Sequence, residues 1–305
     1  MRVLITGSRG TLGIPLAREL RHRGIWVYGC DLAHCGEEED AYMRADVTDY
    51  RQLERVFDTF APDAVYHLAA EFGRHNGERN YEQLWRTNMI GTRNVLELCN
   101  LWNARLIFAS TSEIYGDLEA PTLYEDMSDE MALHQPNEYA LSKWANEVQI
   151  KNFTARHGLD AVRCRFFNVY GPGEHYHPYR SVIALFCHRA LHGIPWTVYE
   201  GYHRTFMYID DFTPTLANVL HEGKAGEVYN IGGEDYRSIR EVSDLILDAT
   251  GADPSLVEYE SHDRHNVQSK RPDNSRARQY LYHNPTVTIE EGIPLTLDWM
   301  RGPNA

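Results

Sequence analysis

ITGSRGTLG, residues 5–13, joins a short apolar run to a longer amphipathic one and holds three glycines, Gly7, Gly10 and Gly13. Glycines between a strand and a helix let the backbone turn tightly and approach a pyrophosphate, which then rests on the helix N-terminus. The spacing is G-x-x-G-x-x-G and not the usual G-x-G-x-x-G, so the loop alone is equally compatible with an ordinary turn. Its place directly after the first expected strand favours a dinucleotide site.

Outward from this loop, short β-branched or apolar runs alternate with longer amphipathic segments. Continuous apolar strands alternating with helices indicate a parallel sheet covered on both faces. We therefore expect an α/β fold with a Rossmann-type, doubly wound parallel sheet and a smaller, mostly C-terminal α/β substrate domain. The expected dinucleotide-binding domain comprises residues 1–165 plus about 204–234, and the expected substrate domain comprises about 166–203 plus 235–305.

Composition excludes several classes of protein. The 305 residues include 30 basic and 44 acidic side chains, and this balance argues against nucleic acid or anionic membranes as main partners. The five cysteines form no Cys-x-x-Cys pair, which indicates a reducing cytoplasm and no zinc site. The chain enters an expected strand at once, and no apolar run approaches the roughly 18 residues of a membrane span. We expect a soluble cytoplasmic protein without a metal.

The end of the second expected strand bears on the choice of cofactor. Asp31 lies there, where a carboxylate can hydrogen-bond the adenosine ribose 2′-hydroxyl and would repel a 2′-phosphate. Arg9 favours NADP instead, because an arginine in the glycine loop can bind the extra phosphate of NADP. Asp46 is explained equally well by an adenine contact and by an exposed turn. The sequence thus favours NAD over NADP.

Tyr139 and Lys143 in NEYALSK are four residues apart and share one face of an expected helix. A lysine ammonium close to a phenol favours the phenolate and lowers the tyrosine pKa. Such a tyrosine can take a proton from a substrate hydroxyl while hydride leaves the same carbon. Two exposed helix residues are the default interpretation of this spacing, and its position downstream of Thr111 is what favours catalysis.

From the N-terminus onward, the chain contains TGSRGTLG, ADVTD, VYHLAA, TNMIGTRNVLE, STSEIYG, YALSK, RFFNVYGPG, RTFMYIDD and VYNIGG. With these motifs the chain resembles the extended short-chain dehydrogenase/reductases of the NAD-dependent nucleotide-sugar epimerase/dehydratase family. The motifs occur in the family's order and cover nearly the whole chain. They are specific for the family and much less so for the reaction.

The resemblance implies roles for the matched positions. The catalytic residues would be Thr111, Glu113, Tyr139 and Lys143. A nucleoside-diphosphate sugar would contact Ser112, Asn168, Arg204 and, as a second arginine, Arg264 or Arg271. The cofactor would be held by Gly7, Arg9, Gly10, Thr11, Leu12, Gly13, Asp31, Asp46, Val47, Leu68, Ala69, Ala70, Asn88, Tyr139 and Lys143. The resemblance also implies a homodimer, packed through helices at about 81–103 and 138–157.

The triplet Thr111-Ser112-Glu113 decides between reactions. A ketone at C4 of the sugar acidifies the neighbouring C–H, and Glu113 is a candidate base at C5 or C3. Ser112 stands where dTDP-glucose 4,6-dehydratases carry an acidic aspartate, which favours an epimerase. The triplet itself resembles GDP-mannose 4,6-dehydratases and UDP-glucuronate decarboxylases, so dehydration or decarboxylation is the alternative. An NADPH-dependent ketosugar reductase is an alternative of another class. In the simplest interpretation, Glu113 has only a structural role and caps the backbone of the loop.

The segment after VYHLAA departs from the family by its charge, with Glu71, Arg74, His75 and Glu78. These side chains would suit a carboxylated or unusual sugar, but a solvated loop is the simpler interpretation.

Overall fold

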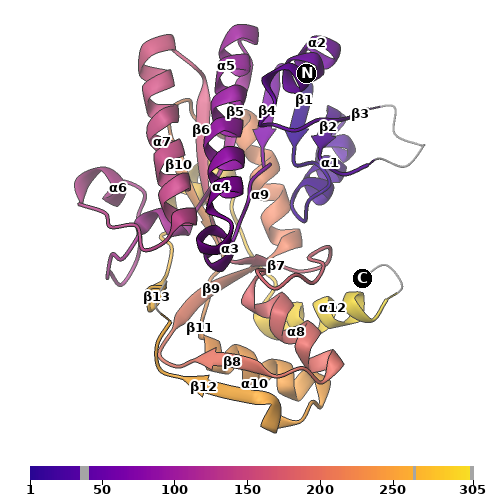
Figure 1. Cartoon of the computed structure of the whole chain (residues 1–305), viewed down its shortest axis with the longest axis vertical. Helices are drawn as coiled ribbons and strands as arrows, with labels where there is room; N and C mark the ends of the chain where they lie inside the picture. Colours follow the sequence, from indigo (N-terminus) through magenta and orange to yellow (C-terminus); the bar gives the residue numbers. More distant parts are fainter. Residues whose placement is uncertain (35–40, 264–265, 303–305) are drawn as a thin grey trace.

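The computed structural model describes residues 1–34, 41–263 and 266–302. Within these residues a seven-stranded, wholly parallel sheet runs through the larger part of the molecule (Figure 1). Its strands, in spatial order, are β10 (Val228–Gly232), β6 (Ala161–Phe167), β5 (Arg105–Thr111), β4 (Ala64–His67), β1 (Arg2–Thr6), β2 (Trp26–Asp31) and β3 (Tyr42–Arg44).

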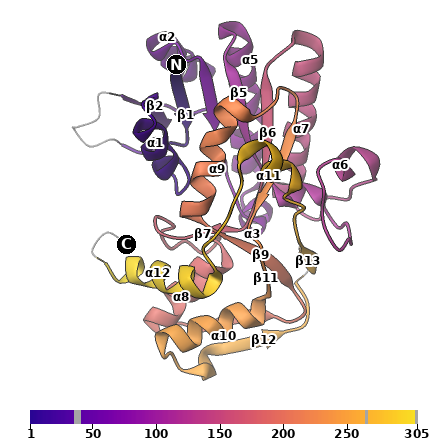
Figure 2. The same ribbon diagram turned by 180° about the vertical axis from the view of Figure 1, so that it is seen from behind.

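Helices cover both faces of this sheet. One face carries α2 (Tyr50–Phe60), α5 (Thr92–Trp102) and α7 (Glu138–His157), whose apolar residues pack with the sheet in one core. The other face carries α1 (Gly13–His22), α9 (Ile209–Glu222) and α11 (Ser275–Leu281), which form a second core and lie in front in Figure 2. The expected Rossmann-type, doubly wound fold is confirmed.

The helix expected at about 81–103 is assembled from three pieces. It begins as α4 (Tyr81–Trp85), widens into a π-helical turn η1 (Arg86–Gly91) and continues as α5. A short helix α3 (Arg74–Arg79) precedes it. The helix expected at 138–157 is α7, which begins after the cap residue Asn137 and ends at Gly158.

The smaller part of the molecule is built on two further sheets. β9 (His203–Tyr208) pairs with β11 (Asp235–Ser238), β13 (Ser269–Lys270) and β7 (Val169–Tyr170), while β8 (Trp196–Tyr199) pairs with β12 (Val257–Glu260). A third core joins them to α8 (Val182–His192), α10 (Ile239–Thr250) and α12 (Ile289–Arg301). The short elements η2 (Ser112–Tyr115), α6 (Met127–Glu130) and η3 (Pro254–Leu256) lie in connections.

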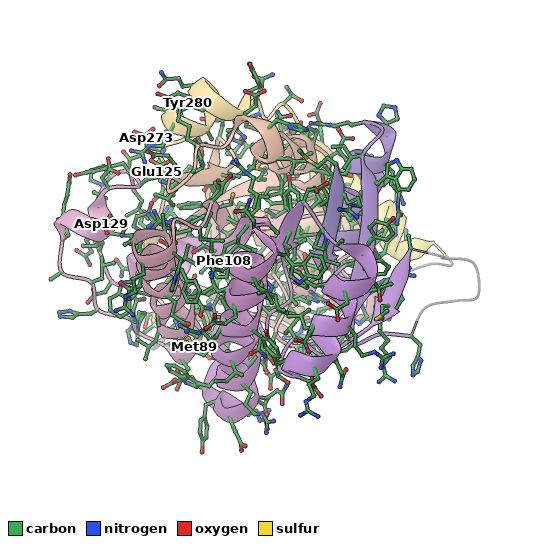
Figure 3. The ribbon with its side chains drawn as sticks, turned by 90° about the horizontal axis from the view of Figure 1, so that it is seen from above. Met89, Phe108, Glu125, Asp129, Asp273 and Tyr280 are labelled. Atoms are coloured by element: carbon green, nitrogen blue, oxygen red, sulfur yellow. The ribbon has the colours of Figure 1, made fainter. Side chains whose placement is uncertain are left out.

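The expected division into two domains stays a prediction. Two elements pack with the part of the molecule opposite to the one expected from their residue numbers. β9 belongs to the smaller sheet, whereas α11 packs against α9 and β10 of the larger part. The chain therefore passes repeatedly between the two parts. Seen from above, Figure 3 shows Phe108 near the middle of the molecule, with Glu125, Asp129 and Asp273 gathered at one side. Among the described helices, none has the length and apolar character that a bilayer span requires.

Candidate active site

The glycine loop lies at the carboxyl end of β1, and its backbone leaves no room for a Cβ at Gly7 or Gly13. Gly7 has a φ of +73°, and a Cβ there would come within 2.7 Å of the Ala69 nitrogen. A Cβ on Gly13 would collide with the Gly7 carbonyl oxygen, whereas one on Gly10 would lie 3.3 Å from the same oxygen. The loop thus forms a close backbone cradle before α1, as a pyrophosphate site requires.

Asp31 lies at the carboxyl end of β2, beside this cradle. Its Oδ2 accepts a hydrogen bond from the Arg9 backbone nitrogen at 2.9 Å, and its Oδ1 accepts one from the Ala33 nitrogen at 3.2 Å. The Arg9 guanidinium stacks on the Tyr42 ring, 4.9 Å from the ring centroid. The carboxylate therefore lines the cleft where a ribose 2′-hydroxyl is expected, and this arrangement fits NAD.

The rest of the cleft gathers the carboxyl ends of the neighbouring parallel strands, as expected of a doubly wound sheet. The cleft has a volume of about 400 Å³. Of the residues that the family resemblance assigns to the cofactor, its walls include Gly7, Arg9, Gly10, Thr11, Leu12, Gly13, Asp31, Asp46, Val47, Leu68, Ala69, Ala70, Tyr139 and Lys143.

Asn88 is the exception, because it lies behind the wall. Its Nδ2 donates to the Glu71 carbonyl and the Ser142 hydroxyl, each at 3.0 Å, and its Oδ1 accepts from the Glu71 nitrogen at 2.9 Å. Asn88 thus fixes the backbone of Glu71, which does line the cleft.

A second cavity, of about 440 Å³, adjoins the cleft. Tyr139, Phe166, Phe72 and Arg180 line both spaces. Thr111, Ser112, Glu113 and Asn168 line only the second one. Thr11 and Leu12 also line both spaces, so the two spaces share a border that includes Tyr139.

The geometry around Tyr139 differs from the expectation in one respect. The Tyr139 hydroxyl is hydrogen-bonded to Thr111, but the Lys143 Nζ donates to the Ala109 carbonyl at 2.8 Å. Burial and the charge of Glu113 raise the pKa of Tyr139, and the Thr111 bond opposes the shift only partly. The direction is opposite to the one expected from the Tyr-x-x-x-Lys spacing, because burial outweighs the neighbouring groups.

Glu113 has a partner that the sequence did not predict. Its Oε1 forms an ion pair with the Nζ of Lys270, whose side chain is 2% exposed. Burial raises the pKa of Glu113, but Lys270, with Arg74 and Arg204, lowers it overall to about 2. Burial in turn lowers the pKa of Lys270 to about 8. Both groups are charged at neutral pH.

The arginines expected to bind a diphosphate differ in burial and in their distance from the second cavity. Arg204 is buried and lines the second cavity, but its terminal nitrogens donate to the carbonyls of residues 203, 267 and 268 and to Asn266. Arg271 is exposed and stacks on Tyr236, away from the lining residues. Arg264 lies outside the described residues.

The simpler interpretation of the charged segment after β4 was a solvated loop, and the structure differs from it. Arg74 and His75 line the second cavity, and the Arg74 Nη1 forms an ion pair with Asp263 Oδ2 at 2.7 Å. Arg74 also acts on the charge of Glu113. The second cavity is therefore lined by both arginines and carboxylates, namely Arg74, Arg180 and Arg204 with Glu113, Glu174 and Asp263. Among the described residues no group of three or more histidine, cysteine or carboxylate side chains is arranged as a metal site.

Comparison with known families and curated proteins gives a consistent result. A model of the "NAD dependent epimerase/dehydratase family" matches residues 3–232. The UDP-N-acetyl-alpha-D-glucosaminuronate decarboxylase of Bacillus cytotoxicus is 31% identical, with 98% of each chain covered. The dTDP-glucose 4,6-dehydratase of Salmonella typhimurium is 29% identical, with 98% of this chain and 92% of the relative covered.

A solved structure resembles the whole chain. The UDP-glucose 4-epimerase of Thermus thermophilus, in complex with NAD, superimposes with a TM-score of 0.89 at 30% identity. The match covers 99% of this chain and 100% of the epimerase. Similar proteins therefore include an epimerase, a dehydratase and a decarboxylase.

Proposed function

Because the chain belongs to the NAD-dependent epimerase/dehydratase family, we propose that it epimerises a nucleoside-diphosphate sugar through a transient 4-keto sugar. One observation carries the proposal: the Tyr139 phenol, bonded to Thr111, stands where the dinucleotide cleft meets the second cavity. A sugar hydroxyl in that cavity and a nicotinamide in the cleft would both face it.

In this proposal, Tyr139 reacts as the phenolate: it takes the proton of the C4 hydroxyl, becomes a phenol, and returns the proton when the ketone is reduced. Thr111 bonds the phenol and orients it, and the charge of Lys143 favours the phenolate. NAD bound in the cleft would supply the hydride acceptor and donor for this chemistry. No net oxidation results, so the product differs from the substrate only in configuration.

The Glu113–Lys270 ion pair supports epimerisation at C4 over the alternatives. A carboxylate whose pKa is about 2 is a weak base, whereas C4 epimerisation needs only that the keto sugar be reduced from its other face. Glu113 would act as a base at C5 or C3 only after a substrate group had drawn Lys270 away. A 4,6-dehydratase would also need an acidic side chain at position 112, and Ser112 is not acidic.

A second candidate function has one observation in its favour. Lys270, Arg74 and Arg204 all act on the charge of Glu113, so the cavity has cations at hand for a second carboxylate. A nucleoside-diphosphate uronate would supply one, and loss of carbon dioxide from a 4-keto uronate would make the protein a decarboxylase. The decarboxylase of Bacillus cytotoxicus supports this candidate as a relative.

Liquid chromatography that resolves epimers, coupled to mass spectrometry, separates the candidates. The protein is incubated in deuterated water with UDP-, GDP- and dTDP-hexoses and with the matching uronates. We expect an isomer without mass change or deuterium, and a Tyr139→Phe variant without turnover. Deuterium in an isomer would show that a C–H bond beside the ketone is broken, which would make Glu113 a candidate base. Loss of water or carbon dioxide would replace the epimerase by a dehydratase or decarboxylase. A requirement for added NADPH would identify a reductase, and full turnover by Tyr139→Phe would contradict the mechanism.

We also propose that the protein is a cytoplasmic homodimer. Tyr81, Ile90 and Leu101 on the α4–η1–α5 helix and Trp144 and Val148 on α7 are exposed, although all are large and apolar. The two helices lie side by side at the front of Figure 1 and contact each other. The four described cysteines are buried and free, which supports a reducing compartment.

A further inference from the structure

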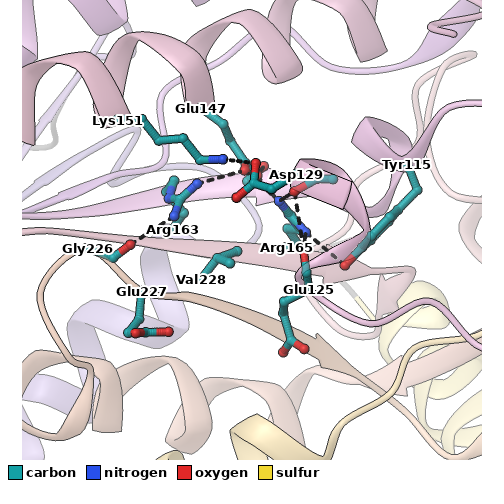
Figure 4. A network of polar contacts seen from close by, with 12 residues as sticks. Tyr115, Glu125, Asp129, Glu147, Lys151, Arg163, Arg165, Gly226, Glu227 and Val228 are labelled. Atoms are coloured by element: carbon teal, nitrogen blue, oxygen red, sulfur yellow. Dashed lines mark hydrogen bonds and ion pairs between the residues drawn. The ribbon is translucent and has the colours of Figure 1, made fainter. Parts of the chain in front are cut away.

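Glu147 is a buried carboxylate directly beneath the catalytic residues of α7. It follows Lys143 by four residues and Tyr139 by eight, so the three side chains share one face of the helix. Ser110, the neighbour of Thr111 on β5, donates its hydroxyl to Glu147 Oε1 at 2.5 Å. The Arg165 guanidinium holds the carboxylate with two hydrogen bonds, of 2.9 Å to Oε1 and 2.8 Å to Oε2 (Figure 4).

The network extends beyond this pair. Arg165 also donates to the Tyr115 hydroxyl at 2.9 Å and the Glu125 carbonyl at 2.8 Å, and Tyr115 donates to Asn230 Oδ1 at 2.7 Å. Through these bonds α7 is tied to β5, β6 and β10 at the end of the sheet that carries Thr111. Figure 4 shows the guanidinium between Glu147 and Tyr115.

A buried ion pair is by itself weak evidence for a contribution to stability. Removing two ions from water carries a large desolvation penalty, and apolar replacements of a buried ion pair are often neutral or stabilising. Arg163, also within 3.4 Å of Glu147, adds a second cation. A role for this network is therefore sought in the proposed catalytic residues next to it. The nearest of these along the helix is Lys143.

Lys143 is itself buried, with its ammonium against the Ala109 carbonyl and 4.9 Å from the Phe108 ring centroid. Burial lowers the pKa of Lys143 to about 7, and the charge of Glu147 opposes that shift. Burial and the charge of Lys143 lower the pKa of His67, on β4, to about 3, so His67 is neutral. Tyr139, with its raised pKa, is a neutral phenol. Among these described neighbours, Glu147 supplies the negative charge.

We propose that Glu147 is a positioning residue that keeps the ammonium of Lys143 charged and seated at the end of β5. The negative charge of Glu147 offsets the positive charges of Arg163 and Arg165. Without it, these two uncompensated cations would lie near the ammonium of Lys143. Its bond to Ser110 fixes α7 against the strand that carries Thr111. The inference rests on the proposed function, since it is there that the charge of Lys143 favours the phenolate of Tyr139.

The test is a titration of Lys143, which does not depend on turnover. Protein labelled with ¹³C at lysine Cε is followed by NMR between pH 5 and pH 11, and the Lys143 signal is assigned with Lys143→Arg. In Glu147→Gln we expect the pKa of Lys143 to fall by about 1 or more, because the opposing charge is lost. The alkaline limb of the kcat profile should move to lower pH by the same amount.

Glu125→Gln is the matched control, because it removes another buried carboxylate, 2.9 Å from the Asn230 nitrogen, at the far end of the same network. We expect it to leave the Lys143 titration in place, and Glu147→Asp to restore most of the wild-type titration. Equal titrations in Glu147→Gln and wild type would overturn the proposal, even if activity fell. If Glu147→Gln does not fold, the wild-type titration decides: a Lys143 pKa below about 6 would mean that Glu147 does not keep it charged. A failure of the proposed reaction would appear in the product analysis and leave this titration unaffected.

Discussion

Glu113 shows how the surroundings of one carboxylate limit what it can do. Its position in the Thr-Ser-Glu triplet suggests a base, but its ion pair with Lys270 keeps it ionised and weakly basic. A proton on carbon beside a ketone would need a stronger acceptor. The same pair places a buried cation directly behind a carboxylate that lines the second cavity. The chemistry of this position therefore belongs to the pair and not to Glu113 alone.

Lys270→Met is expected to destabilise the fold by about 3 kcal/mol at pH 7, because the Glu113 carboxylate is left buried without its cation. In the wild type, the folded pKa of Glu113 is about 2 against an ordinary 4.5, so the pair's contribution is complete above about pH 4.5 and is lost as the pH falls towards 2. The variant should therefore lose less stability over this acid range than the wild type does. Urea unfolding at pH 7, 4 and 3 measures both effects.

Lys270→Arg serves as the control for charge, and Glu113→Gln completes a double-mutant cycle that isolates the coupling between the two side chains. Wild-type stability at pH 7 together with an unchanged acid slope in Lys270→Met would show that the ion pair has no energetic role.

At the scale of elements, most of the fold follows from local pattern. The alternation of apolar strands and amphipathic helices predicts the parallel sheet, and parallel order places the ends of β1, β2 and β5 at one edge. β13 has no such signal, because it is two residues long and exists only through its pairing with β9, where Lys270 lies opposite Arg204. That contact joins segments far apart in the sequence, so no local periodicity records it. The π-helical turn η1 was missed for a similar reason, since its helical pattern continues unbroken.

The junction of β1 and α1 gives a matched pair of substitutions. Gly13→Ala is expected to cost about 3 kcal/mol of stability and to abolish retention of NAD, because the new Cβ would meet backbone atoms of Gly7 and Ser8 that cannot move independently. Gly10→Ala should cost less than about 1 kcal/mol, because its Cβ would meet only one atom within 4 Å, at 3.3 Å. Urea unfolding and quantification of NAD released from the purified protein test both. Similar losses in the two variants would contradict the close-cradle geometry.

For the whole molecule, the two parts have separate tasks. The large sheet presents the cradle and the α7 residues. The smaller part brings Arg204 to the second cavity and pairs Lys270 with Glu113, which lines that cavity. The proposed catalytic residue Tyr139 lines both spaces, so the candidate site needs both parts to be in place. Leu101 on α5 and Trp144 and Val148 on α7 take no part in this arrangement, and they remain exposed in a single chain.

These exposed side chains lead to the prediction of a dimer. Leu101, on α5, is 67% exposed, and Trp144, on α7, is 36% exposed. Placing a charge in an apolar interface is costly, so a Leu101→Glu/Trp144→Glu double variant should be monomeric while the wild type is a dimer. Leu295→Glu is the matched control, because Leu295 is 48% exposed but lies on α12 in the smaller part, and it should leave the dimer intact. Sedimentation equilibrium at several protein concentrations measures the mass of each. A wild-type protein with the mass of one chain, or a double variant that remains a dimer, would show that this helical face is not the interface.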